Sequence, residues 1–377
     1  MLGGSAAPPT TGKANEMFWL FLALVTLLVA LTLLPLWRYE VWWVRGQDFP
    51  RLQYAIFALL LLPAQWLLLD RAEPGTWWLA AATLACLLYQ AWWILPHTPL
   101  WRREVKTLDA AQASECLAIM SVNVLMTNRN ADALLAIVER ARPDVPIALE
   151  TDAWWQSRLD ALERDYPHTM KCPLDNLYGM LLYSRLPLED GRVQFLVEDD
   201  TPSMHAMLVL RSGRRVRLHC VHPKPPSPTE NDTSTERDAE LIAVAKSVAE
   251  CEGDTPVIVA GDLNDVAWSA TTRLFRKISG LLDPRVGRGM YNTFHADYAF
   301  LRWPLDHLFH SAHFGVIGLA RLPAFGSDHF PILVKLAFAE RLVHAQEGLE
   351  PDAGDQQWAA KKAGQEGVSK NDVHTPG

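Results

Sequence analysis

The chain has 377 residues, of which 49% are hydrophobic and 21% are charged, and its formal net charge is −8. At about 150 residues per domain, this length allows two units. Residues 107–337 hold 23 basic and 30 acidic side chains, so a broad basic surface for nucleic acid is excluded there. Five cysteines without a CxxC pair exclude a disulfide framework and a thiolate zinc site as organising features.

Three segments near the N-terminus run for 18 to 21 residues without a charged side chain. As helices, each is long enough to cross a hydrocarbon core of about 30 Å. Ten of the 15 tryptophans lie in residues 1–106, mostly near the ends of these runs, where indole N–H groups meet lipid head groups. We therefore predict a tail over 1–16 and then a membrane anchor over 17–106. Its three transmembrane helices are expected at about 17–37, 52–70 and 77–95.

The distribution of Lys and Arg predicts the orientation of this anchor. Six of them lie in the first loop and directly after the third helix, and two lie on the opposite side. The first run also lacks a small-residue cleavage site, which argues against a cleaved signal peptide. The positive-inside rule therefore predicts a multi-pass protein of the inner membrane with its C-terminal domain in the cytoplasm.

Residues 107–338 have the pattern of one α/β domain. The expected strands are 116–126, 145–150, 179–185, 204–211, 214–222, 255–264, 304–310 and 328–338. The expected helices are 130–143, 153–166, 234–250 and 269–278. Several consecutive strands between helical segments predict two packed sheets flanked by helices. Residues 339–377 hold few large apolar side chains, so we expect a disordered tail.

Polar side chains interrupt or end several of these strands. Asp262 and Asn264 follow an apolar strand two residues apart and project to the same side, although such a pair also closes strands as a turn. Asp306 lies inside an apolar strand, where an unpaired carboxylate is costly to bury, so it needs a partner such as histidine. Asn123 and Glu150 stand where two more strands leave the core, and solvated strand ends are the alternative for both.

In this order and spacing, the motifs resemble the endonuclease/exonuclease/phosphatase superfamily. The resemblance covers about 116–337 and is carried by SVNVL, ALET, YGMLLYSRLPL, VHPKPP, VAGDLND, PLDHLF and GSDHFPI. The GMLLYSRLPL motif and the His-Pro-x-Pro-Pro loop are typical of bacterial membrane-tethered members. The resemblance implies a four-layer α/β/β/α sandwich, with the site at one end of the two sheets.

The resemblance also implies a metal-binding set of Glu150, Asn123 and Asp328. Glu150 would be the principal ligand of a divalent cation, and Asn123 would position a ligand or phosphate nearby. Oxygen donors without thiolates suit Mg²⁺ or Mn²⁺ better than zinc. The expected cofactor is therefore Mg²⁺ or Mn²⁺.

Five further residues are implied for catalysis by the same resemblance. His329, held in one tautomer by Asp306, would take a proton from the attacking water or pair with the phosphate. Asp262 is the alternative water-positioning base. His222 and Asn264 would donate hydrogen bonds to the phosphorane-like transition state.

The sequence thus predicts a membrane-anchored, divalent-metal-dependent phosphoester hydrolase. Its partners would be the bilayer and a lipid head group, a nucleotide or another small phosphoester. Leu149 stands where many nuclease members have Gln, and no counterpart of the basic DNA-binding loops is found, so nucleic acid is disfavoured as substrate. A nuclease of the same fold and a non-catalytic membrane protein that binds phosphate ligands stay as alternatives. The oligomeric state is not indicated.

Overall fold

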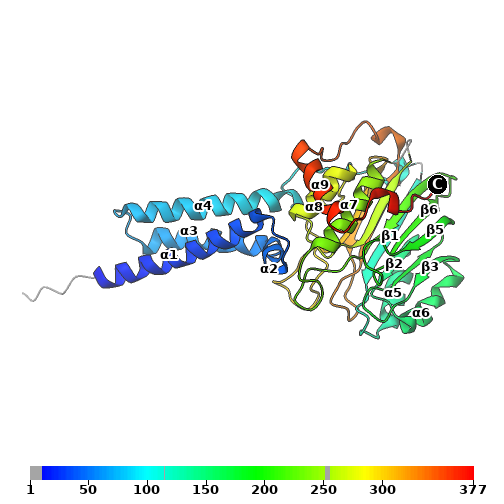
Figure 1. Cartoon of the computed structure of the whole chain (residues 1–377), viewed down its shortest axis with the longest axis horizontal. Helices are drawn as coiled ribbons and strands as arrows, with labels where there is room; N and C mark the ends of the chain where they lie inside the picture. Colours follow the sequence, from blue (N-terminus) through cyan, green and yellow to red (C-terminus); the bar gives the residue numbers. More distant parts are fainter. Residues whose placement is uncertain (1–10, 114, 251–254) are drawn as a thin grey trace, which may run out of the picture. The chain divides into compact units, whose positions relative to one another are not determined.

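A computed structural model describes residues 11–113, 115–250 and 255–377 (Figure 1). These residues form two compact units. The first holds the described residues up to Tyr39 together with Trp43–Leu95, and the second holds Glu40–Trp42 and Pro96–Gly377. Each unit is described by itself.

The first unit is a bundle of helices α1 (Thr11–Leu33), α3 (Arg51–Leu68) and α4 (Pro74–Ile94), with the short α2 (Trp42–Arg45) between α1 and α3. Phe21, Leu28, Leu61 and Leu79 pack in its core, while many leucines and tryptophans of the same helices are exposed. Gln65 Nε2 donates a hydrogen bond to Thr83 Oγ1 at 2.9 Å, which satisfies polar groups between helices. Among the residues that the structure describes, three helices are long and apolar enough to cross a membrane: Asn15–Trp37, Arg51–Leu68 and Pro74–His97.

The second unit contains two sheets. The first sheet has the strand order β10 (Phe314–Arg321), β11 (Ile332–Phe338), β1 (Glu115–Asn123), β2 (Val145–Leu149), β4 (Met180–Ser184) and β3 (His168–Cys172). The second has the order β5 (Leu188–Gln194), β6 (Ser203–Val209), β7 (Arg215–Cys220), β8 (Val257–Asp262) and β9 (Asp306–His310). Leu117 and Ile119 of β1 share one buried apolar core with Leu218 and Ile258 of the other sheet. The two sheets are therefore packed face to face.

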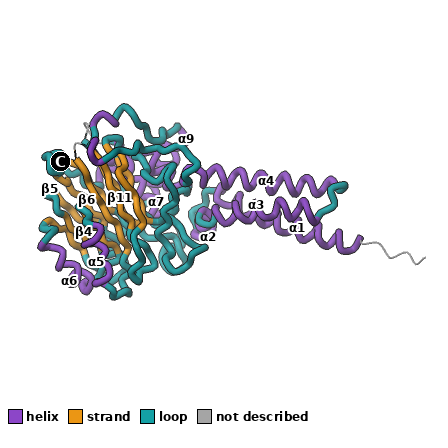
Figure 2. Tube along the Cα trace, turned by 180° about the vertical axis from the view of Figure 1, so that it is seen from behind, coloured by secondary structure: helices purple, strands orange, loops and turns teal. Residues whose placement is uncertain are grey.

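Helices cover both outer faces of this sandwich (Figures 1 and 2). Helices α5 (Ala131–Ala141) and α6 (Ala153–Leu159) pack on the first sheet through Leu134 and Trp155. Helices α7 (Thr235–Ala249), α8 (Ala270–Ser279) and α9 (Ala353–Gln365) pack on the second through Leu241, Phe275 and Ala359. The predicted α/β/β/α sandwich is confirmed.

Three strands that the sequence did not predict, β3, β5 and β10, lie at sheet edges. The side chains of β5 are mostly exposed, and no residue of β3 is fully buried. Strand β10 contains two glycines and a register shift after Val316. Edge strands bury little side-chain surface, so they lack the apolar patterns from which the central strands are recognised.

The structure differs from the expected disordered tail over 339–377, because this segment contains helix α9. The Asp352 carboxylate accepts the Asp355 backbone N–H, and the Asp355 carboxylate accepts the Asp352 backbone N–H, forming a capping box. The small side chains of Ala359 and Ala363 are buried with the α7 core. A helix packed through alanines needs few large apolar residues, and composition therefore misled the prediction.

The strand directions bring six strand ends to one edge of the sandwich: the last residues of β1, β2, β7 and β8 and the first residues of β9 and β11. Strands β1 and β2 are parallel, as are β7 and β8. Strands β11 and β9 run antiparallel to β1 and β8, so their first residues lie beside the last residues of those partners. Asp262 and Asp306 are direct cross-strand partners. The polar residues singled out from the sequence stand on these ends.

Candidate active site

Asn123, the last residue of β1, links two carboxylates from different sheets. Its Nδ2 donates to Glu150 Oε1 at 2.6 Å and lies 3.3 Å from Asp262 Oδ2. Its Oδ1 accepts the Leu125 backbone N–H at 3.0 Å. The amide nitrogen of Asn123 therefore orients the carboxylates, while its oxygen is used by the backbone.

Glu150 directly follows β2 and has a left-handed backbone with φ of 59°. This conformation is strained for a residue with a Cβ, and such strain gathers at functional sites. Burial raises the pKa of Glu150 to about 7, and the nearby carboxylates of Asp328 and Asp262 add to the rise. The hydrogen bond from Asn123 and the charge of His329 lower the pKa of Glu150, but they offset only part of this rise. The charged form of Glu150 is thus disfavoured, and a cation bound beside it would favour that form.

His329 lies between two aspartates. Its Nδ1 is 2.8 Å from Asp306 Oδ2, and its Nε2 is 3.6 Å from Asp262 Oδ2. All three side chains are buried. Burial alone would lower the pKa of His329, but Asp306 and Asp262 outweigh it and raise that pKa to about 10. Burial also raises the pKa of Asp306, although His329 opposes this shift. The arrangement favours a cationic imidazole.

His222 and Asn264 lie on the second-sheet side of the site. His222 follows β7 and is buried, and burial lowers its pKa to about 4, so it is neutral near pH 7. Its ring centroid is 5.2 Å from that of Tyr178. The backbone N–H of Asn264 donates to Asp262 Oδ1 at 2.9 Å, and its Nδ2 donates to the Pro223 carbonyl at 2.9 Å. Asn264 therefore joins the Asp262 turn to the loop after His222.

Gly261 permits the close approach of β7 and β8 at this point. Its φ is +143°, and a Cβ placed there would lie 2.0 Å from the Val221 carbonyl oxygen. Glycine is therefore required for both conformation and space. Because the ends of β7 and β8 are this close, His222 and Asp262 lie side by side at the same edge of the second sheet.

Asp328 precedes His329 and is partly exposed. Its carboxylate influences the pKa of both Glu150 and His329, so it belongs to the same cluster. Ser327 donates from Oγ to the Asn123 carbonyl at 2.8 Å and accepts the His329 backbone N–H at 3.0 Å. Ser327 thereby ties the start of β11 to the end of β1.

All eight residues singled out from the sequence thus lie at one edge of the sandwich. The structure adds residues that sequence reasoning did not single out, namely Ser327, Tyr178 and Arg237. Ser327 and Tyr178 stand within the quoted GSDHFPI and YGMLLYSRLPL motifs, which was the available signal. Arg237 stands among charged residues of a helix and gave no signal, yet its guanidinium donates to the Asn264 carbonyl at 2.8 Å.

Two places in this cluster offer donors to a cation. Asp262, Asp306 and His329 each present a ligand atom, and these atoms lie within 4.8 Å of one another. However, His329 Nδ1 and Asp306 Oδ2 already form a hydrogen bond of 2.8 Å with each other. Glu150 instead stands near further carboxylates that raise its pKa, and a divalent cation would relieve their repulsion. The carboxylate oxygens around Glu150 fit a hard cation such as Mg²⁺ or Mn²⁺.

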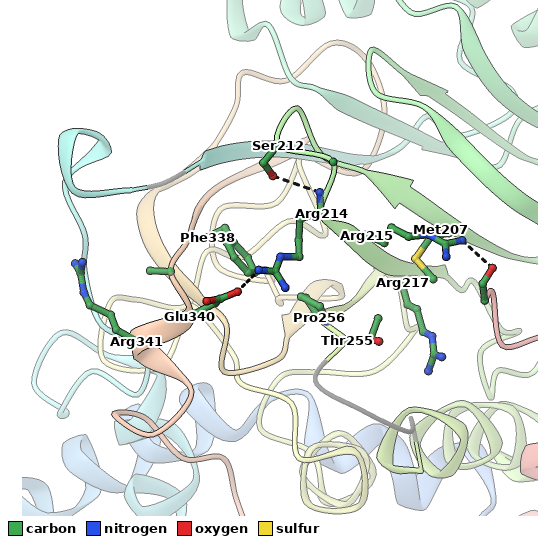
Figure 3. Close-up of a pocket in the computed structure, with 13 residues that line it drawn as sticks. Met207, Ser212, Arg214, Arg215, Arg217, Thr255, Pro256, Phe338, Glu340 and Arg341 are labelled. Carbon is green, nitrogen blue, oxygen red and sulfur yellow. Dashed lines mark hydrogen bonds and ion pairs between the residues drawn. The ribbon is translucent and has the colours of Figure 1, made fainter.

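A separate cavity of 990 Å³ lies at the other end of the second sheet, between the β6–β7 turn and the start of β8 (Figure 3). Its lining includes Arg214, Arg215, Arg217 and Arg341, and the first two have acidic partners. Arg214 pairs with Glu340, and Arg215 lies 3.1 Å from Glu189. The eight residues of the cluster are not among those that line it. The carboxylate and histidine cluster is therefore the stronger candidate for chemistry.

The chain matches the model of the Endonuclease/Exonuclease/phosphatase family over residues 120–329. This match spans more than half of the chain and all eight residues, and the chain belongs to that family. Members of the family are metal-dependent phosphoester hydrolases, and the protein is an enzyme of this class. No curated protein sequence matches the chain.

Solved structures are similar to part of the chain. The human Nocturnin catalytic domain with bound sulfate anion is 17% identical, with a TM-score of 0.50, and the match covers 63% of this chain and 99% of that one. D. rerio TDP2 complexed with single strand DNA product is 18% identical, with a TM-score of 0.48 and coverage of 59% and 98%. A family protein from Bacteroides thetaiotaomicron is 15% identical, with a TM-score of 0.49 and coverage of 59% and 98%. At 17% identity, the similarity to the Nocturnin domain concerns the fold alone.

Proposed function

We propose that the protein is a membrane-anchored hydrolase that cleaves a lipid, nucleotide or other small phosphoester with Mg²⁺ or Mn²⁺. The observation that carries this proposal is the convergence of Glu150, Asp262 and His329 at one edge of the sandwich, through contacts with Asn123 and Asp306. Their chemistry suits phosphoester hydrolysis, because they combine a cation site, a base and a cationic imidazole.

Glu150 and Asp328 would hold the cation, and Asn123 would keep the Glu150 carboxylate in place. The bound cation would neutralise the charge that builds on a phosphoryl oxygen. Asp262 is placed to orient the attacking water and accept its proton. His329, already cationic, is suited to pair with the phosphate rather than to take that proton, with Asp306 fixing its ring.

The neutral His222 would donate a hydrogen bond to a phosphoryl oxygen. The Nδ2 of Asn264 donates to Pro223, so we assign Asn264 to holding the Asp262 turn and the His222 loop in register. This differs from the direct phosphate contact that the resemblance implied for Asn264. The assignment rests on the positions of both nitrogens of Asn264.

The rim beside His222 favours a small phosphoester over nucleic acid. Tyr178 donates its hydroxyl to Glu230 at 3.1 Å. Lys224 pairs with Glu198 at 3.1 Å and with Asp200 at 2.8 Å, so its charge is matched by acidic partners. Such a rim repels a long polyanion, whereas a compact substrate needs only the central cation.

Membrane anchoring is supported by the three apolar helices, each long enough for a bilayer. We propose that residues 17–106 contain the anchor and residues 107–338 the catalytic domain. We further propose an inner-membrane protein with this domain in the cytoplasm, because more Lys and Arg flank that side. An enzyme held at the bilayer has ready access to lipid head groups.

The function is tested with the full chain in detergent, assayed with Mg²⁺, Mn²⁺ or a chelator. The substrates are phosphoinositides, sphingomyelin, bis(p-nitrophenyl) phosphate and plasmid DNA. We expect metal-dependent hydrolysis of a lipid or small phosphoester, and no hydrolysis with chelator. Glu150→Gln should lower turnover by about a thousandfold, because charge stabilisation of the transition state depends on the cation.

Glu139→Gln on the exposed face of α5 is the matched control and should behave as wild type. Faster cleavage of DNA than of every other substrate would assign a nuclease. Failure of the folded wild-type protein to hydrolyse any of them with either metal would contradict the proposal and leave a phosphate-binding protein.

A further inference from the structure

A buried charge network lies behind the candidate active site and reaches its Asp262 turn. The network begins at Arg237 in the first turn of α7, whose side chain is 1% exposed. Its Nη1 donates to the Asn264 carbonyl at 2.8 Å, and its Nη2 lies 3.6 Å from Asp265 Oδ2. Arg237 thus holds the backbone of the turn that follows β8.

The position of Asn264 matters for Asp262. Asn264 has a left-handed backbone with φ of 51°, so it adopts an uncommon conformation that needs support. Its N–H donates to Asp262 Oδ1, while Asp262 Oδ2 faces Asn123 and His329. A shift of the Asn264 peptide would therefore rotate the Asp262 carboxylate away from the proposed water.

Asp238 and Lys362 hold Arg237 in turn. Asp238 Oδ1 accepts from Nε and Nη2 of Arg237 at 3.1 and 2.9 Å. Its Oδ2 accepts from Ser234 Oγ at 2.8 Å and from Lys362 Nζ of α9. Burial opposes ionisation, but Lys362 and Arg237 outweigh it and hold the pKa of Asp238 well below its usual range. The forked guanidinium is thereby locked in one orientation.

Glu40 completes the network from the segment between α1 and α2. Its Oε1 is 3.2 Å from Lys362 Nζ, and its Oε2 accepts from Thr235 Oγ1 at 3.1 Å and Gln365 Nε2 at 2.9 Å. The Glu40 carbonyl also accepts the Ser234 N–H at 2.8 Å. Two acidic and two basic side chains then alternate from Glu40 to Arg237, each charge facing its opposite.

We propose that Glu40, Lys362, Asp238 and Arg237 are positioning residues that hold the Asn264 turn in its active geometry. The proposal rests on the proposed function for its effect on turnover. Two of the four, Glu40 and Lys362, lie outside the 120–329 span of the family match. The segment before α2 and helix α9 thus take part in placing a catalytic carboxylate.

The test uses the full chain and two readouts. Lys362→Met removes the charge that faces Asp238 and keeps most of the side-chain volume. Turnover should fall about tenfold, the effect of losing one buried charged hydrogen bond, with KM changed less than about threefold. Amide hydrogen exchange of the peptide 262–266 should become faster, because the Asn264 N–H loses its fixed acceptor. Lys362→Arg should restore both values.

Glu104→Gln is the matched control. Glu104 forms a buried ion pair with Arg276 of α8, whose Nη2 lies 2.5 and 2.6 Å from the two carboxylate oxygens of Glu104. Among the described residues, the Glu104 carboxylate bonds to Arg276 and to the Asp283 N–H, and not to the Asn264 turn. The Glu104→Gln variant should have a lower unfolding temperature, while its turnover and the hydrogen exchange of peptide 262–266 should stay unchanged. If Lys362→Met does not fold, Glu40→Gln replaces it, since an isosteric amide at Glu40, the more exposed end of the network, disturbs packing least.

Unchanged exchange of peptide 262–266 in a folded network variant would overturn the inference, whether or not the enzyme turns over. Equal acceleration of exchange in Glu104→Gln would overturn it too, because the effect would then be general loosening. An inactive wild-type chain would contradict the proposed function, and in that case the exchange arm alone decides the positioning role.

Discussion

The burial of His329 between Asp306 and Asp262 is the feature that most constrains the chemistry. A histidine with one carboxylate partner acts as a base when its pKa lies near neutrality. Here two carboxylates raise the pKa of His329 to about 10, despite the opposing effect of burial. We therefore propose that Asp262 accepts the proton of the attacking water and that His329 stabilises charge on the phosphate.

We expect His329→Gln and Asp262→Asn to keep the fold and to lower turnover by about a thousandfold each, because each removes charge next to the transition state. Both replacements preserve volume in a buried site. The measurement is steady-state hydrolysis with Mg²⁺, together with circular dichroism as the control for folding. Turnover near the wild-type value in either folded variant would remove the assigned roles.

A buried pair of histidines, His205 in β6 and His219 in β7, lies away from the site. His205 Nδ1 and His219 Nδ1 are 2.7 Å apart, and Ser203 Oγ is 2.9 Å from His205 Nε2. Burial, aided by Arg217 and His374, lowers the pKa of His219 to about 3. Burial, with His219 and His374, holds the pKa of His205 well below 6.5. Both rings are therefore neutral in the folded state.

This pair predicts a loss of stability in mild acid. An unfolded histidine has a pKa of about 6.5, so unfolding takes up protons below that pH. Stability is complete above that pH and falls by about 1.4 kcal/mol per histidine for each pH unit below it, until the folded pKa is reached. In His219→Gln, the unfolding temperature should fall less steeply between pH 7 and 5. The exposed His344→Gln is the control, and equal slopes in all three proteins would contradict the prediction.

At the scale of the elements, the close approach of the parallel strands β7 and β8 depends on Gly261. Gly261→Ala should lower the free energy of unfolding by more than about 4 kcal/mol, because backbone strain and overlap with the Val221 carbonyl add. Gly213→Ala, in a turn with φ of +82° and open space around the Cβ position, should cost only about 1 kcal/mol. Thermal unfolding of both variants measures the difference, and equal losses would refute the steric argument.

The central strands and helices could be predicted because buried elements have regular patterns of apolar residues in the sequence. The strands ending at Asn123 and Asp262 are apolar runs followed by polar residues, which indicated both the core and the site. The edge strands and α9 left no such trace, since their stability comes from neighbours and from capping at Asp352. Arg237 was missed for a similar reason. In the sequence, a buried arginine such as Arg237 cannot be distinguished from an exposed one on the surface of a helix.

At the scale of the whole molecule, the anchor predicts a topology that can be measured. A reporter active only in the cytoplasm, fused after residue 337, should be active, because Lys and Arg are concentrated on that side of the three helices. A reporter active only outside the membrane, fused at the same place, should be silent. The reverse pattern would place the site outside the cytoplasm and exclude cytoplasmic nucleotides as substrates.

The segment Glu40–Trp42 belongs to the second unit although helices of the first unit flank it on both sides. The Trp42 N–H donates to the Asp232 carbonyl, and Val41 forms a β-bridge with Thr233. Glu40 is 195 residues before Thr235 and 322 before Lys362. If the helices insert in the bilayer as we propose, these partners of Glu40 leave the ribosome only after the first helices have been made. The Glu40 contacts of the second unit therefore cannot form until helix α9 has been made, and a second unit that began at Pro96 would lack them.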